Sequence, residues 1–237
     1  MSQKPISDAK KILIRSFGRR RSKGLRVTRA EAMEEVLPRC TLFPLPPGEH
    51  RIDPRSCFDQ PVKAAWFEIG FGNGEHLLHQ AIHNPDVGFI GCEPFMNGVS
   101  ALCVGIKEHG LTNIRIWPED ARLLMERLQP QSLDRLFLLH PDPWPKNRHQ
   151  KRRFVQTETL DQIAALLTPG AELRMATDHQ ELAAWVLEKT YFHRAFQWLA
   201  TSADDWRKPP ADWPETRYGQ KGVQQGRPPV FFIFKKI

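Results

Sequence analysis

Short apolar runs alternate with amphipathic segments from about residue 62 onward. The runs have the length and composition of buried strands, whereas the segments between them repeat their apolar residues every three to four positions, as helices do. This pattern predicts strands over 63–70, 87–93, 113–120, 133–140 and 171–178, a weaker one over 196–200 and a last one over 228–237. It predicts helices over 74–84, 95–110, 121–128, 151–167 and 179–193, and a Pro-rich loop over 207–227.

The regular alternation of strand and helix indicates an α/β fold. Repeated βα units favour a Rossmann-like, doubly wound and mostly parallel sheet. Because right-handed crossovers bring the carboxyl ends of parallel strands to one edge, we expect the ligand site along that edge.

Residues 1–60 have a different pattern, that of a basic N-terminal arm and linker before an α/β domain over 61–237. The formal net charge of the chain is +7, yet residues 1–29 hold ten Lys and Arg side chains against one acid, Asp8. Basic arms bind polyanions through counterion release, although a solvated, disordered tail would have the same composition. A helix is predicted after Thr28, where Glu31 three residues later would complete a capping box.

Length and composition exclude several classes of protein. A chain of 237 residues fits one α/β domain with a short appendage. No stretch approaches the roughly 18 to 20 consecutive apolar residues of a membrane span, and the charged N-terminus lacks the apolar core of a signal peptide. The four cysteines form no CxxC pair and suit a reducing compartment. We therefore expect a cytoplasmic protein that does not associate with membranes.

Carboxylates end four consecutive predicted strands. The first strand ends in EIGFGNGE, which contains Glu68 and the glycines Gly70, Gly72 and Gly74. The next three end at Glu93, Asp120 and Asp142. Glycines allow backbone N–H groups to approach a ligand at a helix N-terminus, although such a loop can also be a simple turn. The GxGxG spacing differs from the GxGxxG fingerprint of dinucleotide sites. The first three strand ends outline an adenosine pocket, with Glu93 at the ribose and Asp120 at the adenine.

Residues 138–153 read LLHPDPWPKNRHQKRR and combine a constrained acid with a run of cations. Asp142 lies between two prolines, and Trp144 could stack on a base or pack. The cationic strip that follows contains Lys146, Arg148, His149, Lys151, Arg152 and Arg153. We expect something anionic to compensate these charges. The alternative is a solvated first helical turn, but cations at a helix N-terminus oppose its dipole.

Three histidines, His76, His79 and His83, share one face of the predicted helix over 74–84. Only side chains on adjacent turns would converge, and no carboxylate is suitably spaced with them. We therefore expect no metal site.

Several motifs, taken in order, carry a family resemblance: EIGFGNGE, GCEPF, PED, PDPWPKNRHQKRR, the Thr177-Asp178 pair and TRYGQKG at 216–222. Together they resemble the bacterial tRNA (guanine-N7-)-methyltransferase family, which consists of class I S-adenosylmethionine-dependent methyltransferases. The likeness extends from about residue 12 to residue 237, and the PDPW segment with its cations is its most specific part.

The resemblance implies S-adenosylmethionine as the cofactor and tRNA as the partner, with methyl transfer to N7 of guanine 46 in the variable loop. No obligate protein partner is evident. The implied cofactor positions are Glu68, Gly70, Gly72, Gly74, Glu93, Asp120 and Asp142, and Asp142 is the implied catalytic residue. The resemblance implies that the cationic strip contacts RNA phosphates. The other implied RNA-contact positions are Asp178, Thr216, Arg217, Tyr218 and Gly219. The family usually has glutamate where this chain has Gly219.

The chemistry of guanine N7 explains a rigid carboxylate. N7 has a free lone pair, so no proton must be removed before it attacks, and catalysis consists mainly of orientation. Asp142 could accept from the guanine N1–H and N2–H₂ edge and balance the charge on the methylated ring. Two alternatives are a non-catalytic RNA-binding protein and an NAD-dependent oxidoreductase on the same fold.

Overall fold

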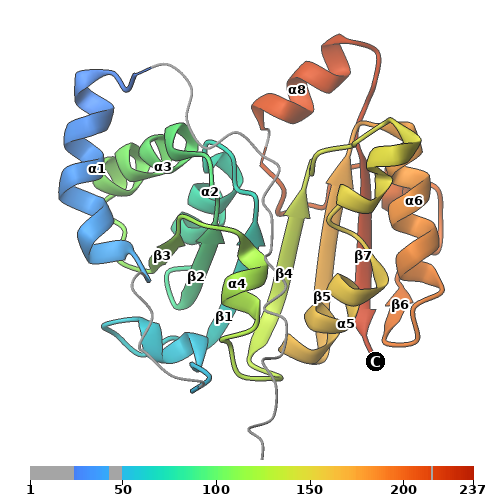
Figure 1. The fold of residues 1–237 in the computed structure, drawn as a ribbon, viewed down its shortest axis with the longest axis horizontal. Helices are drawn as coiled ribbons and strands as arrows, with labels where there is room; N and C mark the ends of the chain where they lie inside the picture. The colour runs from blue at the N-terminus through green and yellow to red at the C-terminus, as the bar shows by residue number, and fades with distance from the viewer. Residues whose placement is uncertain (1–23, 43–49, 215) are drawn as a thin grey trace, which may run out of the picture.

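The computed structural model describes residues 24–42, 50–214 and 216–237. Within them one sheet has the strand order β3-β2-β1-β4-β5-β7-β6 (Figure 1). The strands are β1 (Ala64–Ile69), β2 (Val87–Cys92), β3 (Ile114–Trp117), β4 (Leu133–Leu139), β5 (Leu167–Thr177), β6 (Phe196–Trp198) and β7 (Val230–Lys236). Strands β1 to β5 pair in parallel, whereas β7 runs antiparallel to both β5 and β6. The predicted Rossmann-like, mostly parallel sheet is confirmed.

The register of the parallel strands aligns their carboxyl ends. Ile69 of β1 pairs with Cys92 of β2 and with Leu138 of β4, and Cys92 pairs with Trp117 of β3. The residues that follow these four positions therefore emerge side by side at one edge of the sheet.

Helices cover both faces of the sheet. They are α1 (Val27–Cys40), α2 (Glu75–His83), α3 (Met96–His109), α4 (Ala121–Met125), α5 (Thr157–Leu166), α6 (Gln180–Tyr191), α7 (Asp204–Arg207) and α8 (Arg217–Gln224), with 3₁₀ helices η1 (Pro54–Cys57) and η2 (Asn147–Arg152). One apolar cluster joins the sheet to α1, α2 and α3, and a second joins it to α4, α5 and α6. In the part of the chain with described coordinates, no helix is both long and apolar enough to span a membrane.

Helix α1 shows that the described part of the predicted arm and linker packs onto the sheet domain. It lies against α3 (Figure 1), and its side chains Ala32, Val36 and Cys40 are buried. The predicted capping box at Thr28 is wrong, because the N-cap is Arg26, two residues earlier, and it makes no side-chain cap bond. Most cations of the predicted arm belong to residues 1–23, which lie outside the described residues.

Two other predictions of local structure were wrong. The helix predicted over 151–167 is divided into η2 and α5, because Gln156 and Thr159 form a capping box that starts a new helix at Thr157. The predicted loop over 207–227 contains α8, whose N-terminus is capped by the Thr216 side chain. Glycines within α8 lower its intrinsic helix propensity and hid it from the sequence pattern.

Candidate active site

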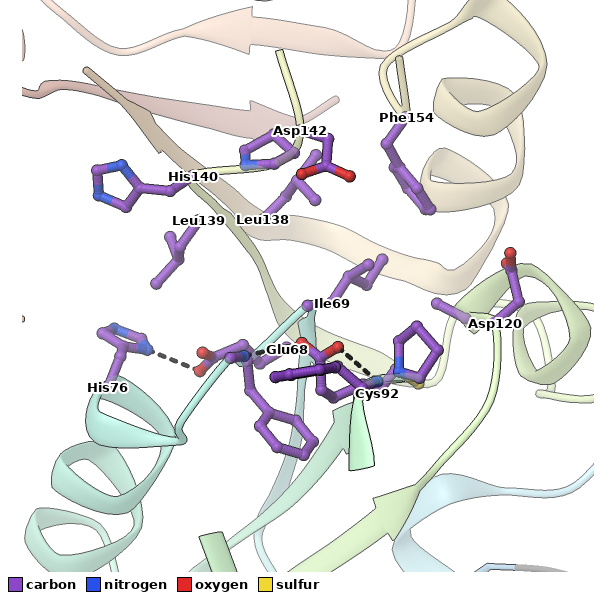
Figure 2. Close-up of a pocket in the computed structure, with 18 of the residues that line it drawn as sticks. Glu68, Ile69, His76, Cys92, Asp120, Leu138, Leu139, His140, Asp142 and Phe154 are labelled. Atoms are coloured by element: carbon purple, nitrogen blue, oxygen red, sulfur yellow. Dashed lines mark hydrogen bonds and ion pairs between the residues drawn. The ribbon is translucent and has the colours of Figure 1, made fainter. Parts of the chain in front are cut away.

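The carboxyl ends of β1, β2 and β4 open onto one cavity of about 520 Å³. Figure 2 shows Glu68 on one wall and Asp142 across the cavity, with Asp120 to one side. From the predicted set, the cavity is lined by Glu68, Gly70, Gly72, Glu93, Asp120, Asp142, Arg152 and Thr216. The fold therefore brings the predicted cofactor positions together with Thr216, except for Gly74, which is the N-cap of α2 and does not line the cavity.

The glycine loop after β1 has the left-handed backbone that favours glycine. Gly70, Gly72 and Gly74 have φ values of 74°, 57° and 83°. Close packing adds a second requirement, because a Cβ on Gly98 of α3 would lie 2.2 Å from the carbonyl oxygen of Gly72. The loop therefore has a fixed shape, set by its own glycines and by a glycine of the facing helix.

Glu93, which follows β2, fastens the glycine loop. Its Oε2 accepts a hydrogen bond from the N–H of Gly72 at 2.9 Å, and its Oε1 accepts from the N–H of Phe95 at 2.9 Å. Burial raises the pKa of Glu93 above its ordinary value; the two backbone donors oppose this shift, and the nearby carboxylates of Asp142 and Glu68 add to it. The cavity therefore has an excess of negative charge, which a cationic ligand would relieve.

Glu68 is almost completely buried, with 2% of its surface exposed. Its Oε2 contacts Nδ1 of His76 at 2.7 Å (Figure 2), and the His76 ring packs 4.6 Å from Phe137 and 5.0 Å from Trp213.

The three histidines of α2 do not converge. His76 faces Glu68, whereas the rings of His79 and His83 lie 4.1 Å apart. Within the described ranges, no group of three or more His, Cys, Asp or Glu side chains is arranged to hold a metal ion.

Asp120 has a partner that the sequence pattern did not reveal. It caps α4 by accepting from the N–H of Arg122, and its two carboxylate oxygens also accept from the Arg122 guanidinium at 2.9 and 2.7 Å. This pairing raises the pKa of Arg122. Both side chains line the cavity, so this wall presents an ion pair rather than a lone carboxylate.

The loop after β4 carries Asp142 between two residues in the left-handed region. His140 has φ 47° and Trp144 has φ 41°. The Trp144 ring has Arg152 above it at 5.0 Å and the His149 ring edge-on at 5.8 Å. Trp144 therefore packs against the cationic strip and also lines the cavity.

Exposure differs along the cationic strip. Lys146, Arg148 and Lys151 are exposed, and Arg152 is partly buried. Arg153, a predicted RNA contact, differs from them, because its side chain is buried and its guanidinium binds Glu181.

Asp178, which follows β5, lies beside the loop after β4. Its Oδ1 is 3.7 Å from Nδ1 of His140, and its Oδ2 is 3.4 Å from Nη2 of Arg227. Burial lowers the pKa of His140, and the Asp178 carboxylate only partly offsets this shift. His140 is therefore neutral near pH 7.

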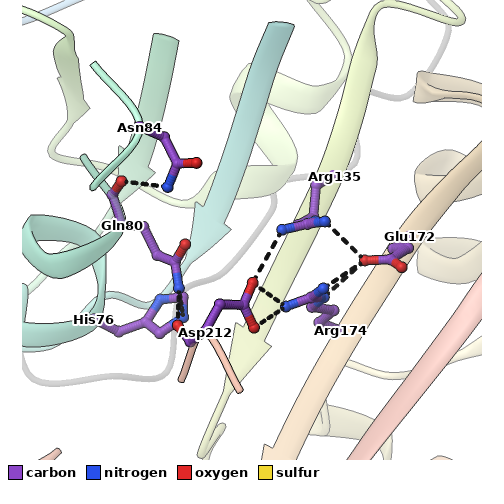
Figure 3. Close-up of polar contacts among 7 residues, drawn as sticks. All are labelled: His76, Gln80, Asn84, Arg135, Glu172, Arg174 and Asp212. Carbon is purple, nitrogen blue, oxygen red and sulfur yellow. Dashed lines mark hydrogen bonds and ion pairs between the residues drawn. The ribbon is translucent and has the colours of Figure 1, made fainter. Parts of the chain in front are cut away.

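The segment before α8 is anchored on the sheet by a polar network that no sequence motif predicted (Figure 3). Arg174 of β5 donates to both carboxylate oxygens of Asp212 at 2.8 Å, and Arg135 of β4 lies 3.4 Å from Asp212 Oδ2. Glu172 pairs with both arginines. Gln80 of α2 donates to the Asp212 carbonyl at 2.7 Å.

This anchor precedes the predicted RNA-contact residues of α8. Thr216 Oγ1 accepts from the N–H of Gly219 at 3.2 Å, and Arg217 and Tyr218 belong to the first turn between them. The anchor therefore sets where this turn lies relative to the cavity.

Comparison with known proteins identifies the family. Residues 63–232 match a family model described as "Putative methyltransferase". The chain is 47% identical over 237 residues to a tRNA (guanine-N(7)-)-methyltransferase of Rhodospirillum rubrum, covering all of this chain and 91% of that protein. It is 45% identical over 223 residues to the protein of the same name from Paramagnetospirillum magneticum, covering 94% and 92%. The chain belongs to the tRNA (guanine-N7-)-methyltransferase family.

Solved structures of methyltransferases have the same fold as this methyltransferase. The aminoglycoside resistance methyltransferase NpmB1 aligns with a TM-score of 0.53 at 19% identity over 74% of this chain and 88% of that one. The 16S rRNA methyltransferase KamB aligns with a TM-score of 0.51 at 17% identity over 78% and 90%. The resemblance stated from the motifs is thus confirmed, whereas the roles of individual site residues remain predictions.

Proposed function

We propose that this enzyme transfers the methyl group of S-adenosylmethionine to N7 of a guanine in tRNA, by family resemblance guanine 46 of the variable loop, to give 7-methylguanosine. The observation that carries the proposal is the single cavity that joins the glycine loop and Glu93 to Asp142 and the edge of the cationic strip. The names of the most similar curated proteins support the same reaction. The proposed substrate implies a cytoplasmic site of action.

The residues around the cavity fit S-adenosylmethionine. The cavity of about 520 Å³ has the size of a typical small-molecule site. A Cβ on Gly70 would meet no atom within 4 Å, so the backbone there is open to a ligand. Glu93 can accept from ribose hydroxyls. The surplus of carboxylates also suits a cation, and the bound cofactor would supply a methyl group on a positively charged sulfur.

Asp142 would orient the guanine. Its carboxylate extends from a loop that is stiffened by Pro141 and Pro143, and it can accept from the N1–H and N2–H₂ edge of the base. The same carboxylate balances the positive charge that methylation places on the ring. No base is required to activate N7, so rigid placement is the main contribution of this loop.

The exposed cations would position the RNA rather than select the base. Lys146 directly precedes η2, and Arg148 and Lys151 lie on it; the neighbouring residues Trp144 and Arg152 line the cavity. Contacts from such side chains to phosphates fix the register of a nucleic acid and make binding dependent on salt.

One experiment tests the proposal directly. Bulk tRNA is incubated with the enzyme and S-adenosylmethionine labelled in its methyl group, and the labelled base is mapped. Label on guanine N7 is the expected result, and label on another atom contradicts the proposed chemistry. Tight tRNA binding without transfer would instead support a non-catalytic RNA-binding protein. Calorimetric titration with S-adenosylmethionine and with NAD, in parallel, distinguishes a methyltransferase from an oxidoreductase.

A further inference from the structure

Arg153 points into the protein, beneath the loop that carries Asp142. Only 2% of the residue is exposed, although it ends a run of solvent-facing cations. Its Nε donates to the carbonyl of Pro143 at 2.9 Å, and its Nη2 donates to the carbonyl of Trp144 at 3.5 Å. Both acceptors belong to the two residues directly after Asp142.

These carbonyls lie on either side of the strained residue in the loop. Trp144 has φ 41°, a left-handed conformation that is costly for a bulky side chain. Such a conformation persists only where the surroundings hold it. The guanidinium of Arg153 binds the peptide oxygen before the Trp144 backbone and the one after it, so it holds that conformation from both sides.

The remaining contacts of Arg153 tie the loop to α6. Its Nη2 lies 2.5 Å from Oε1 of Glu181, in the first turn of that helix, and its guanidinium lies 4.9 Å from the Trp185 ring. The same Glu181 oxygen accepts from Gln150 of η2 at 3.2 Å. A planar guanidinium can satisfy these partners together, whereas a lysine ammonium is a point charge on a flexible stem.

We propose that Arg153 is a positioning residue for methyl transfer, which fixes the Asp142 carboxylate over the cavity by holding the backbone of Pro143 and Trp144. It does not contact RNA. The inference rests on the proposed function for its kinetic consequence, but its structural basis can be tested without activity.

The test compares two neighbouring cations. Arg153→Lys keeps the charge but loses the fork of donors, and we expect kcat to fall about 10- to 100-fold with tRNA affinity and its salt dependence close to wild type. Lys151→Gln is the matched variant at an exposed position of the strip, and there we expect weaker tRNA binding and a log–log salt slope reduced by about 0.7 to 0.9. If Arg153→Lys instead lowers the slope and leaves kcat unchanged, Arg153 is a phosphate contact and the proposal is wrong.

A second measurement is independent of catalysis. Hydrogen exchange of the peptide that covers residues 142–154 should become faster in Arg153→Lys and, by a smaller factor, in Glu181→Gln, which retains the shape of the acid. Unchanged exchange in both variants would overturn the proposal even if turnover falls. Absence of methyl transfer by the wild-type enzyme would count against the proposed function and leave this exchange result to decide the role of Arg153. Glu181→Gln is a milder change. If Arg153→Lys does not fold, hydrogen exchange in Glu181→Gln still tests the proposal.

Discussion

The two sides of the cavity are built in different ways. The proposed cofactor side consists of strand ends and a glycine loop, which is fastened by the hydrogen bond from Gly72 to Glu93 and lined by the buried Glu68. The proposed RNA side consists of two segments, residues 140–154 and residues 212–214 with 216–222. Those segments are held from behind by arginines: Arg153 under the first, and Arg135 with Arg174 under the second.

The difference follows from what each side can use for support. Strand ends inherit their positions from the ladder of the sheet, so the cofactor side requires few additional contacts. Connecting segments have no ladder, and charge-assisted hydrogen bonds to buried guanidinium groups replace it. Substitutions on the proposed cofactor side should therefore change cofactor affinity, and substitutions of Asp142 or of the residues that hold it should change turnover.

Asp142→Asn should have the largest effect and tests the RNA side. The amide keeps the shape but loses the negative charge that faces the base, and loss of one well-placed electrostatic contact typically costs about 10²–10³ in rate. Cofactor affinity should remain close to wild type. Single-turnover kinetics with titration of S-adenosylmethionine measures both quantities, and wild-type turnover would remove Asp142 from the mechanism.

Glu93→Ala tests the cofactor side. It removes the proposed acceptor for the ribose hydroxyls, the bond that fastens the glycine loop through Gly72, and the bond to the Phe95 N–H. We expect cofactor binding to weaken by about 1.5 to 3 kcal/mol, as for hydrogen bonds to a charged group. Calorimetry gives this value directly. Unchanged cofactor affinity would show that another residue binds the ribose and that Glu93 does not belong to the cofactor side.

His140 lies where the two sides meet, and it predicts a dependence of stability on pH. Burial lowers its folded-state pKa, whereas the unfolded side chain takes up a proton near pH 6.5. The contribution of neutral His140 to the free energy of unfolding is therefore fully present above about pH 6.5, and it is lost as the pH falls below that value.

His140→Asn should reduce this loss, because Asn tolerates positive φ and does not titrate in this range. Thermal unfolding of both proteins between pH 7.5 and 5.5 measures the difference, which we expect to be a few degrees at the acidic end. The pKa values of His79 and His149 are also lowered. Both residues are present in both proteins, so their contributions cancel in the difference. If the melting temperatures of the two proteins change with pH in parallel, the Asp178 carboxylate offsets the effect of burial and the pKa of His140 is not lowered.

Gly219→Glu should have the smallest effect and concerns only the RNA side. Gly219 occupies the third position of α8, where Glu would complete a capping box with Thr216. Replacing a helical glycine and adding this pair should stabilise the helix by about 1 kcal/mol. Circular dichroism and hydrogen exchange of α8 measure the gain. Cofactor affinity should not change, and a change would show that α8 communicates with the glycine loop.

The sequence predicted the cofactor side better than the RNA side, for a physical reason. Glu68, Glu93 and Asp142 follow apolar runs whose period is local, and a parallel sheet brings strand ends together without further information. Arg153 shows the limit of this reasoning, since nothing in a run of cations indicates which one turns inward.

Long-range pairs were also hidden. Arg174 and Asp212 are separated by 38 residues, and Arg135 and Asp212 by 77. No local period connects such residues, so the anchor of the segment before α8 could be found only in the structure.

The position of β7 constrains how the chain can be made. This strand lies between β5 and β6 in the sheet, although β6 precedes it in the chain. A growing chain on the ribosome therefore produces β6 before β7, the only strand with which β6 pairs in the described sheet. Phe196 of β6, which is buried in the folded protein, cannot pair with β7 until that strand has been synthesised. Domains fold largely as units during synthesis, and here completion of that half of the sheet is delayed until the Phe232–Phe234 segment emerges. During that interval β5 is an edge strand of the sheet, and its backbone N–H and C=O groups on that side are unpaired.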